Sequence, residues 1–206
     1  MIFIRYEDWR SYLRYYPVTS LLLAANIVMF IIEVFTGGST DNMNLLRLGA
    51  VTEHPQLSSE WWRLFAAMFL HAGVMHLVSN CFALLVFAPP LERLMGHIKY
   101  FVLYIFSGVI GNIITLAVYQ SQHSLQYHVA VGASGAIYGI YGAFLFIALL
   151  QRNLMDENSR KTLYSLLMIG VVYSFVVTQI NWIAHFGGLL GGFVLYAILS
   201  RFIKNH

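Results

Sequence analysis

Two residues of the sequence could together hydrolyse a peptide bond, Ser134 and His185. Ser134 lies in the run Gly132-Ala133-Ser134-Gly135 at a predicted helix start, where free backbone N–H groups and the positive end of the helix dipole favour a developing anion. His185 could take the serine proton, because an unperturbed imidazole has a pKa of about 6.5 and works around neutral pH. The pair predicts a serine nucleophile with a histidine base.

Three further side chains could complete such a site. His76 and Asn80 are four residues apart on one predicted helix, so they point the same way and could donate to an oxyanion. Tyr138 lies one turn below Ser134, and its ring could pack against His185. The outer halves of the last three predicted helices contain no Asp or Glu, so we predict a Ser–His dyad without an acidic third member.

Other hydrolase sites fit the sequence less well. A metal site could use His71, His76 and His185, but the chain lacks the His-Glu-x-x-His spacing of zinc proteases and no carboxylate joins these histidines. An aspartyl intramembrane protease is excluded because no predicted helix contains an Asp. We therefore expect neither a metal nor another cofactor.

Glycines at four-residue spacing would let two helices approach closely. One pair is Gly135 with Gly139, and the other is Gly188 with Gly192, on the face of His185. Small residues at this spacing are typical of close helix contacts in membranes, although such a pair alone is a weak signal of catalysis. Here they would bring Ser134 and His185 together.

The elements that carry these residues are predicted to be membrane helices. The 206 residues are 59% hydrophobic and 10% charged, against about 25% charged in an ordinary soluble domain. Charged residues are absent from 64–91, 100–151 and 162–200. Because a membrane span needs about 20 mostly apolar residues, the last two stretches can each hold a pair of helices.

The hydropathy pattern predicts an all-α bundle of six transmembrane helices, in a membrane domain over 18–206. The expected helices cover 18–35, 74–91, 98–119, 133–150, 163–180 and 182–203. The polar and aromatic segment 1–17 is expected to be cytoplasmic, either as a short interfacial helix or as a plain anchor. The longest predicted loop, 37–73, carries Trp61 and Trp62, which suit a membrane interface.

Basic residues predict the orientation. With the N-terminus inside, two basic residues, Arg47 and Arg63, are external, and ten are cytoplasmic: Arg5, Arg10, Arg14, Arg93, Lys99, Arg152, Arg160, Lys161, Arg201 and Lys204. This bias predicts a multi-pass protein with both termini cytoplasmic. No basic cluster is dense enough to suggest a nucleic-acid partner.

This topology places the polar residues at one depth. The second, fourth and sixth predicted helices all run inward, so their first residues lie near the outer face. His76, Asn80, Ser134 and His185 then fall within about two turns of one level. Since polar groups facing lipid are costly, we expect these side chains to face the bundle interior and form one site.

The combined motifs resemble those of the rhomboid proteases, in their minimal six-helix bacterial form. The matching residues are Trp62-Arg63, His71 followed by His76 and Asn80, Gly-Ala-Ser134-Gly with Tyr138, and Ala184-His185 followed by Gly188 and Gly192. The resemblance spans most of the chain in the family's order.

The resemblance implies an intramembrane serine endopeptidase acting through an acyl-enzyme. Ser134 would be the nucleophile and His185 the base, while His76, Asn80 and the Ser134 amide would bind the oxyanion. His71 would pack and organise water, and the pairs Trp62-Arg63 and Glu92-Arg93 would be structural. Its substrates would be single-span membrane proteins, cut near the outer end of their helix beside a small residue. The site would face the extracytoplasmic side of a bacterial plasma membrane.

Two non-proteolytic classes stay open. A rhomboid-like binding or quality-control protein is one, although such proteins typically lose the Ser or His that this chain keeps. A transporter is the other, and it would need an ion-coupling carboxylate near mid-membrane. Glu33 lies toward the outer end of the first predicted helix and is interpreted as interfacial.

Overall fold

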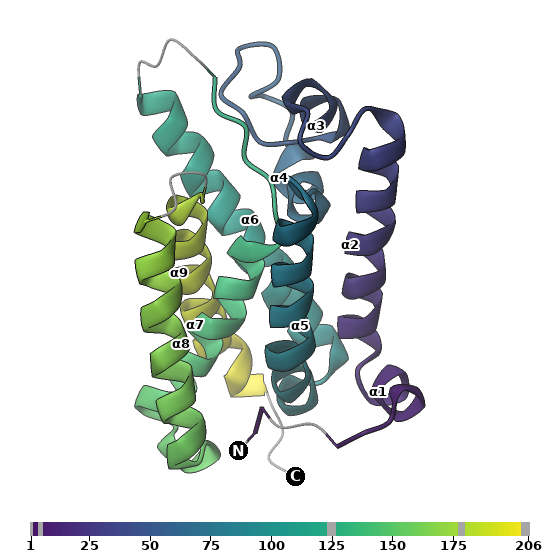
Figure 1. Ribbon diagram of the computed structural model, residues 1–206. Helices are drawn as coiled ribbons and strands as arrows, with labels where there is room; N and C mark the ends of the chain where they lie inside the picture. Colours follow the sequence, from purple (N-terminus) through teal and green to yellow (C-terminus); the bar gives the residue numbers. More distant parts are fainter. Residues whose placement is uncertain (1, 4–5, 123–126, 177–179, 203–206) are drawn as a thin grey trace.

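The computed structural model describes residues 2–3, 6–122, 127–176 and 180–202. It is a bundle of helices (Figure 1). The α-helices are α1 Trp9–Tyr15, α2 Pro17–Thr36, α3 Asn42–Leu48, α4 Arg63–Ala66, α5 Val74–Met95, α6 His97–Ser121, α7 Ser134–Leu150, α8 Glu157–Val176 and α9 Trp182–Leu199, and the 3-10 turns are η1 Ala67–Phe69, η2 Arg152–Leu154 and η3 Ser200–Phe202. All-helical architecture is thereby confirmed.

Each of the six segments predicted to cross the membrane contains a helix, although Ala133 and Ile180, at the edges of two of them, are not helical. Within the described residues, four helices are long and apolar enough to span a bilayer: α2, α5, α6, and α9 continued through η3. The apolar helix α7 is shorter, with 17 residues, and the first turns of α8 carry the charged residues Glu157, Arg160 and Lys161. Six membrane crossings and the orientation of the termini stay predictions.

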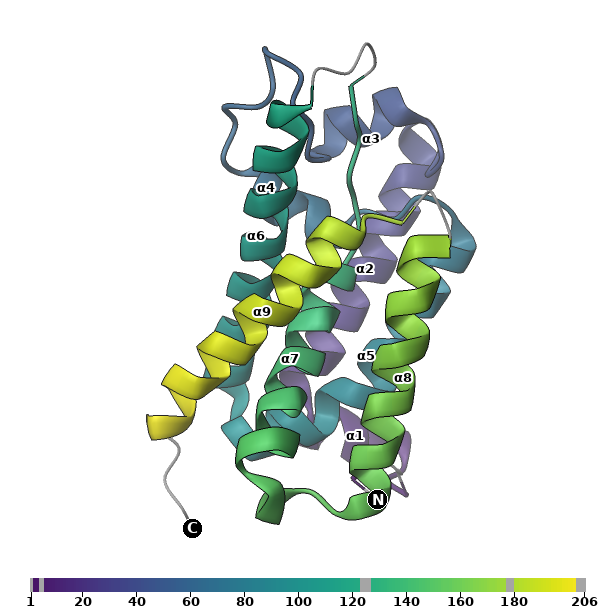
Figure 2. The ribbon, with the colours of Figure 1, turned by 90° about the vertical axis from the view of Figure 1, so that its left-hand side faces the viewer.

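Helix α7 lies at the centre of the bundle. Its side chains are buried over much of its length, against α5, α6 and α9. Seen from the side, α9 crosses obliquely over α7, and α8 stands at the edge of the bundle (Figure 2). Helices α3 and α4 lie at one end of the molecule, and α1 and η3 lie at the other (Figure 1). The central helix is the one that begins with Ser134.

A buried carboxylate ties the start of α2 to α5. Glu92 accepts hydrogen bonds from the backbone N–H groups of Val18 and Thr19, at 3.0 and 2.9 Å, and from the Thr19 hydroxyl at 2.6 Å. The first N–H groups of a helix lack intrahelical acceptors, and the positive dipole end attracts an anion. Glu92 therefore fixes the end of α5 that is farthest from His76.

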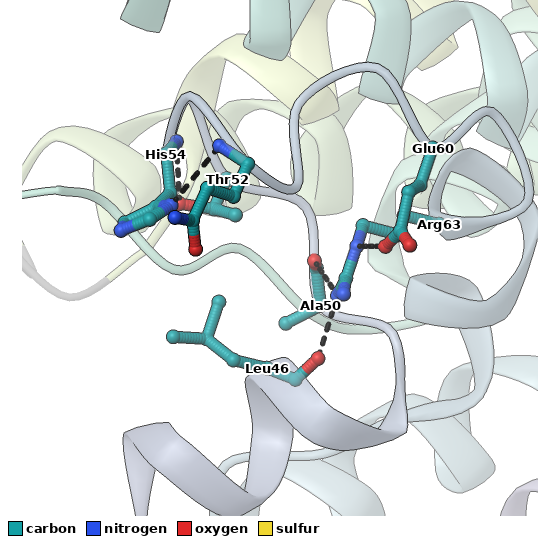
Figure 3. A network of polar contacts seen from close by, with 7 residues as sticks. Leu46, Ala50, Thr52, His54, Glu60 and Arg63 are labelled. Carbon is teal, nitrogen blue, oxygen red and sulfur yellow. Dashed lines mark hydrogen bonds and ion pairs between the residues drawn. The ribbon is translucent and has the colours of Figure 1, made fainter.

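The predicted loop 37–73 is partly helical and is organised around Arg63 (Figure 3). Arg63 is 5% exposed, and its guanidinium donates to Glu60 Oε2 at 2.7 Å. It also donates to the carbonyl oxygens of Leu46 and Ala50, at 2.6 and 3.2 Å. Its carbon Cζ lies 4.8 Å from the centre of the Trp62 ring. These contacts join α4 to the end of α3.

Glu33, expected from the sequence to be interfacial, is buried within the protein. Its side chain is fully buried and accepts a hydrogen bond from the backbone N–H of His71 at 2.9 Å. The chain between α2 and α5 folds back over the end of α2, which removes Glu33 from solvent. A buried N–H needs an acceptor, and this carboxylate supplies it.

Candidate active site

Ser134 is the first residue of α7 and follows a non-helical segment, 127–132, and a turn at Ala133. Figure 2 shows this segment running inward from the end of the molecule that carries α3. An antiparallel bridge joins Val51 to Ala130, with N–H to oxygen distances of 3.0 and 2.9 Å. Ser134 is thus held below the end of the bundle.

The N-terminus of α7 carries no side-chain cap. The residue before the helix is Ala133, which makes no capping hydrogen bond. The N–H groups of the first turn, including that of Ser134, therefore lack an intrahelical acceptor. Such donors favour an anion at this position.

Gly132 brings α5 against this turn. Its φ of 124° lies in the left-handed region that favours glycine. A Cβ atom at this position would lie 2.7 Å from His76 Nε2 and 3.7 Å from Asn80 Nδ2. The structure therefore brings His76 and Asn80 together beside the backbone that leads into Ser134.

Asn80 has a free donor. The side chain is 5% exposed, and its Nδ2 has no hydrogen-bond partner among the described residues. A buried polar group without a partner costs about 1–3 kcal/mol. A side chain that serves only to join helices would be paired, so an unpaired amide here is a candidate donor to a substrate oxygen.

The position of His185 is fixed by the capped N-terminus of α9. The Asn181 side chain accepts from the N–H of Ala184 at 3.1 Å, which caps the helix, and donates to Thr115 on α6 at 3.1 Å. The His185 ring stacks on Tyr138, with ring centres 4.1 Å apart and planes at 9°. The Tyr138–His185 contact expected from the sequence is therefore present. Among the described residues no hydrogen bond links Ser134 to His185, and in enzymes without substrate such bonds are often long.

Ser174 is a member of this cluster that the sequence analysis missed. Its Oγ lies 2.8 Å from His185 Nδ1 and 3.3 Å from the Tyr138 hydroxyl. Helix α8 runs opposite to the inward helices, so the end that carries Ser174 reaches the level where α9 begins (Figure 2). The sequence could have indicated Ser174 if the membrane depth of the last residues of the outward-running helices had been considered along with that of the first residues of the inward-running ones.

Glycines let α7 and α9 touch. A Cβ at Gly188 would overlap the carbonyl oxygen of Gly135, and one at Gly192 would overlap the carbonyl oxygen of Gly139. By contrast, a Cβ at Gly135 would make an ordinary contact with the Ala184 carbonyl oxygen, at 3.5 Å. The close approach predicted from the two glycine pairs is present, but it depends on the glycines unequally.

His71 packs behind His76. The two rings meet edge to face with centres 5.2 Å apart, and His71 Nδ1 lies 3.2 Å from the Phe69 carbonyl oxygen. His71 is fully buried, and its Nε2 has no partner among the described residues. Its ring therefore packs directly against that of His76.

Besides the Val51–Ala130 bridge, hydrogen bonds between Glu53 and His128 hold the segment before Ser134. Glu53 Oε1 lies 2.7 Å from His128 Nδ1 and accepts from the His128 backbone N–H at 3.0 Å. Burial raises the pKa of the Glu53 carboxyl, but these hydrogen bonds outweigh burial, so the pKa lies below its ordinary value. The His128 ring also stacks on Tyr119, with centres 4.2 Å apart.

Comparison with known proteins shows which family this chain resembles. The Rhomboid domain matches residues 58–202. YdcA of Bacillus subtilis, a protein named as a rhomboid protease, is 37% identical over 198 residues, or 94% of each chain. Rhomboid protease GluP of the same organism is 33% identical over 182 residues, which are 88% of this chain and 34% of GluP. Inactive rhomboid protein 1 of Danio rerio is 34% identical over 146 residues, which are 69% of this chain and 16% of that protein.

Proposed function

The chain belongs to the rhomboid family, and on that premise we propose that it is an intramembrane serine endopeptidase with Ser134 as nucleophile and His185 as base. Its substrates are single-span membrane proteins, cut near the outer end of their transmembrane helix. The site opens toward the extracytoplasmic side of the cell membrane.

The arrangement at the start of α7 supports this activity most strongly. Ser134 begins a helix with no side-chain cap, and His185 is stacked on Tyr138, one turn further along that helix. His76 and Asn80 lie beside Gly132, two residues before the nucleophile. A nucleophile, a base and oxyanion donors come from α7, α9 and α5.

These groups can divide the reaction between them. His185 takes the proton of Ser134 as the serine oxygen attacks the scissile carbonyl. The resulting oxyanion accepts hydrogen bonds from the Ser134 amide and from the side chains of His76 and Asn80 on α5. His185 then gives that proton to the leaving amine, and an acyl-enzyme on Ser134 results. Water attacks the ester with His185 again acting as base, which releases the acid product and restores the serine.

Two variants and a probe test this function. Ser134→Ala and His185→Ala should each abolish cleavage of a single-span reporter substrate in detergent, because nucleophile and base act as a unit. A fluorophosphonate probe should label the native protein and not Ser134→Ala. Equal labelling of both proteins would overturn the role of Ser134.

Chelation separates this mechanism from a metal-dependent one. EDTA should leave the cleavage rate unchanged, whereas serine-directed isocoumarins should suppress it. Loss of activity in EDTA with recovery on adding zinc would favour a metal site at the histidines instead.

A non-proteolytic role is the second candidate, because one relative is named an inactive rhomboid protein. A chain with this role would bind the reporter substrate without cleaving it. Co-purification of intact reporter with the native protein, together with absence of probe labelling, would support it.

A further inference from the structure

We propose that Ser174 is a positioning residue that fixes the protonation pattern of the His185 ring, an inference that rests on the proposed function. Ser174 comes from α8, whereas Ser134 and His185 come from α7 and α9. Its hydroxyl oxygen lies 2.8 Å from His185 Nδ1, on the edge of the ring opposite the nitrogen that must serve as base.

The count of hydrogens around Ser174 decides the direction of this bond. A serine hydroxyl has one proton to donate and two lone pairs that accept. Ser174 donates its proton to the carbonyl oxygen of Gly170, at 2.7 Å. The hydroxyl oxygen can therefore only accept from His185, so Nδ1 carries the ring proton. The other nitrogen, Nε2, is then free to take the proton of Ser134.

Tyr138 completes the arrangement. Its hydroxyl lies 3.3 Å from Ser174 Oγ and can donate to the second lone pair, while its ring stacks on the imidazole. Ser174, Tyr138 and His185 are 5%, 9% and 8% exposed. Hydrogen bonds among buried groups are stronger than in water, and leaving one unmade is costly. The orientation of the His185 ring and the nitrogen that carries its proton are thus both fixed.

A neutral hydroxyl suits this position in a membrane. In serine proteases with a triad, a buried Asp holds the histidine tautomer and stabilises the imidazolium. An ionised carboxylate at this depth would be expensive. A serine polarised by the Gly170 carbonyl offers an acceptor without a net charge.

The surroundings of Ser174 set it apart from the rest of α8. Near it, Val172, Tyr173 and Phe175 are all exposed on the surface of the bundle. Ser174 is one of the few buried residues of this helix, with Ser159 and Leu163. The hydroxyl is therefore turned into the protein, toward His185.

Kinetics of matched variants test the role. Ser174→Ala should lower kcat about 10- to 100-fold with KM unchanged, since part of the contribution of a general base is lost when its tautomer is no longer fixed. Ser174→Thr should restore most of kcat, because threonine keeps the hydroxyl. Ser165→Ala is the control, an exposed serine on the same helix. Ser174→Cys, which keeps the volume with a weaker acceptor, should fall in between and serves if the alanine variant does not fold.

A spectroscopic measurement tests the same idea without activity. Nitrogen-15 spectra of histidine-labelled protein should show His185 with the proton on Nδ1, and Ser174→Ala should show a mixture of tautomers. The His185 signals are identified by their loss in His185→Gln.

The outcomes separate this inference from the proposed function. If the fluorophosphonate probe labels the native protein and Ser134→Ala equally, the proposed function is overturned. An active native enzyme whose Ser174→Ala variant keeps kcat and the native tautomer overturns only the role of Ser174. Loss of kcat in both Ser174→Ala and Ser174→Thr, in step with a lower melting temperature, also overturns it, because that pattern marks a structural residue.

Discussion

The imidazole of His185 is held by neutral groups on two sides, a tyrosine ring on its face and a serine hydroxyl on its edge. Two asparagine side chains of the bundle differ in whether their amide nitrogen is hydrogen-bonded. Asn80 leaves its amide unpaired among the described residues, whereas Asn112 on α6 donates to the Leu64 carbonyl oxygen at 2.8 Å. Asn112 thus joins two elements, whereas the Asn80 amide nitrogen can still donate to a substrate oxygen. The two asparagines should therefore respond differently to substitution.

Asn80→Ala is expected to reduce turnover without unfolding the protein. One lost oxyanion donor typically costs about 10²–10³ in rate, and we expect the lower end because His76 and the Ser134 amide remain. KM should be spared, since the amide acts mainly in the transition state. Steady-state kinetics and thermal unfolding in detergent measure both quantities. Asn112→Ala is the matched control and should lower the melting temperature. Wild-type kcat in Asn80→Ala would contradict the oxyanion role.

At the scale of elements, the contact between α7 and α9 is made backbone to backbone. Gly188 and Gly192 meet carbonyl oxygens of α7, whereas Gly135 meets Ala184 at an ordinary distance. A side chain can rotate away from a new methyl group, but a helix carbonyl cannot. The contact is therefore intolerant of a methyl group at Gly188 and Gly192 and tolerant of one at Gly135.

Gly188→Ala should destabilise the protein, and Gly135→Ala should not. Overpacking typically costs about 1–3 kcal/mol and occasionally more, and we expect the upper end where the clash is with backbone. Thermal unfolding of the two purified variants in detergent is the measurement. Equal melting temperatures for Gly188→Ala and the native protein would show that α9 can shift away from α7 at little cost.

The non-helical segment before α7 depends on Glu53, and this dependence should vary with pH. The folded-state pKa of Glu53 is lowered, so its ionised form contributes stability that is present above the unfolded pKa of about 4.3 and is lost as pH falls through the folded value. Glu53→Gln should lower the melting temperature at pH 7, and the difference from wild type should shrink below about pH 4.

A surface carboxylate provides the control for that experiment. Glu157 pairs with Lys161 at 2.7 Å, but both side chains are largely exposed. Exposed pairs contribute little to stability. Glu157→Gln should leave the melting temperature nearly unchanged at either pH. A difference between wild type and Glu53→Gln that persists undiminished at low pH would contradict an ionised Glu53.

At the scale of the whole molecule, the bundle has two chemically distinct ends. The loop organised by Arg63 lies at one end, and α1 and η3 lie at the other (Figure 1). Ten of the twelve basic residues belong to the second end in the predicted topology. The positive-inside bias then assigns the Arg63 end to the exterior.

Cysteine labelling in intact cells tests that orientation. Cys81 is the only native cysteine, so a Cys81→Ser background can carry Ser59→Cys in the first loop or Asn153→Cys in η2, both at exposed positions. An impermeant maleimide should label Ser59→Cys in intact cells and Asn153→Cys only after permeabilisation. The opposite pattern would invert the predicted topology.

The sequence by itself determined the helices and the residues that are proposed to carry the chemistry. Helix hydrogen bonds are local, and in a membrane every span must satisfy them within itself, so a charge-free run is enough to locate a span. Each of the six predicted segments contains a helix. The types of Ser134 and His185, and their places at helix starts, follow from the order of residues alone.

Only the tertiary structure decided which faces of the helices meet. Depth is a one-dimensional property that the chain order reveals, whereas rotation about each helix axis depends on packing against neighbours. That rotation turns Ser174 toward His185, and the fold of the first loop buries Glu33 against His71. It also makes Gly188 intolerant and Gly135 tolerant of a methyl group. Side-chain contacts between segments distant in sequence leave no local pattern, because they arise when the helices pack.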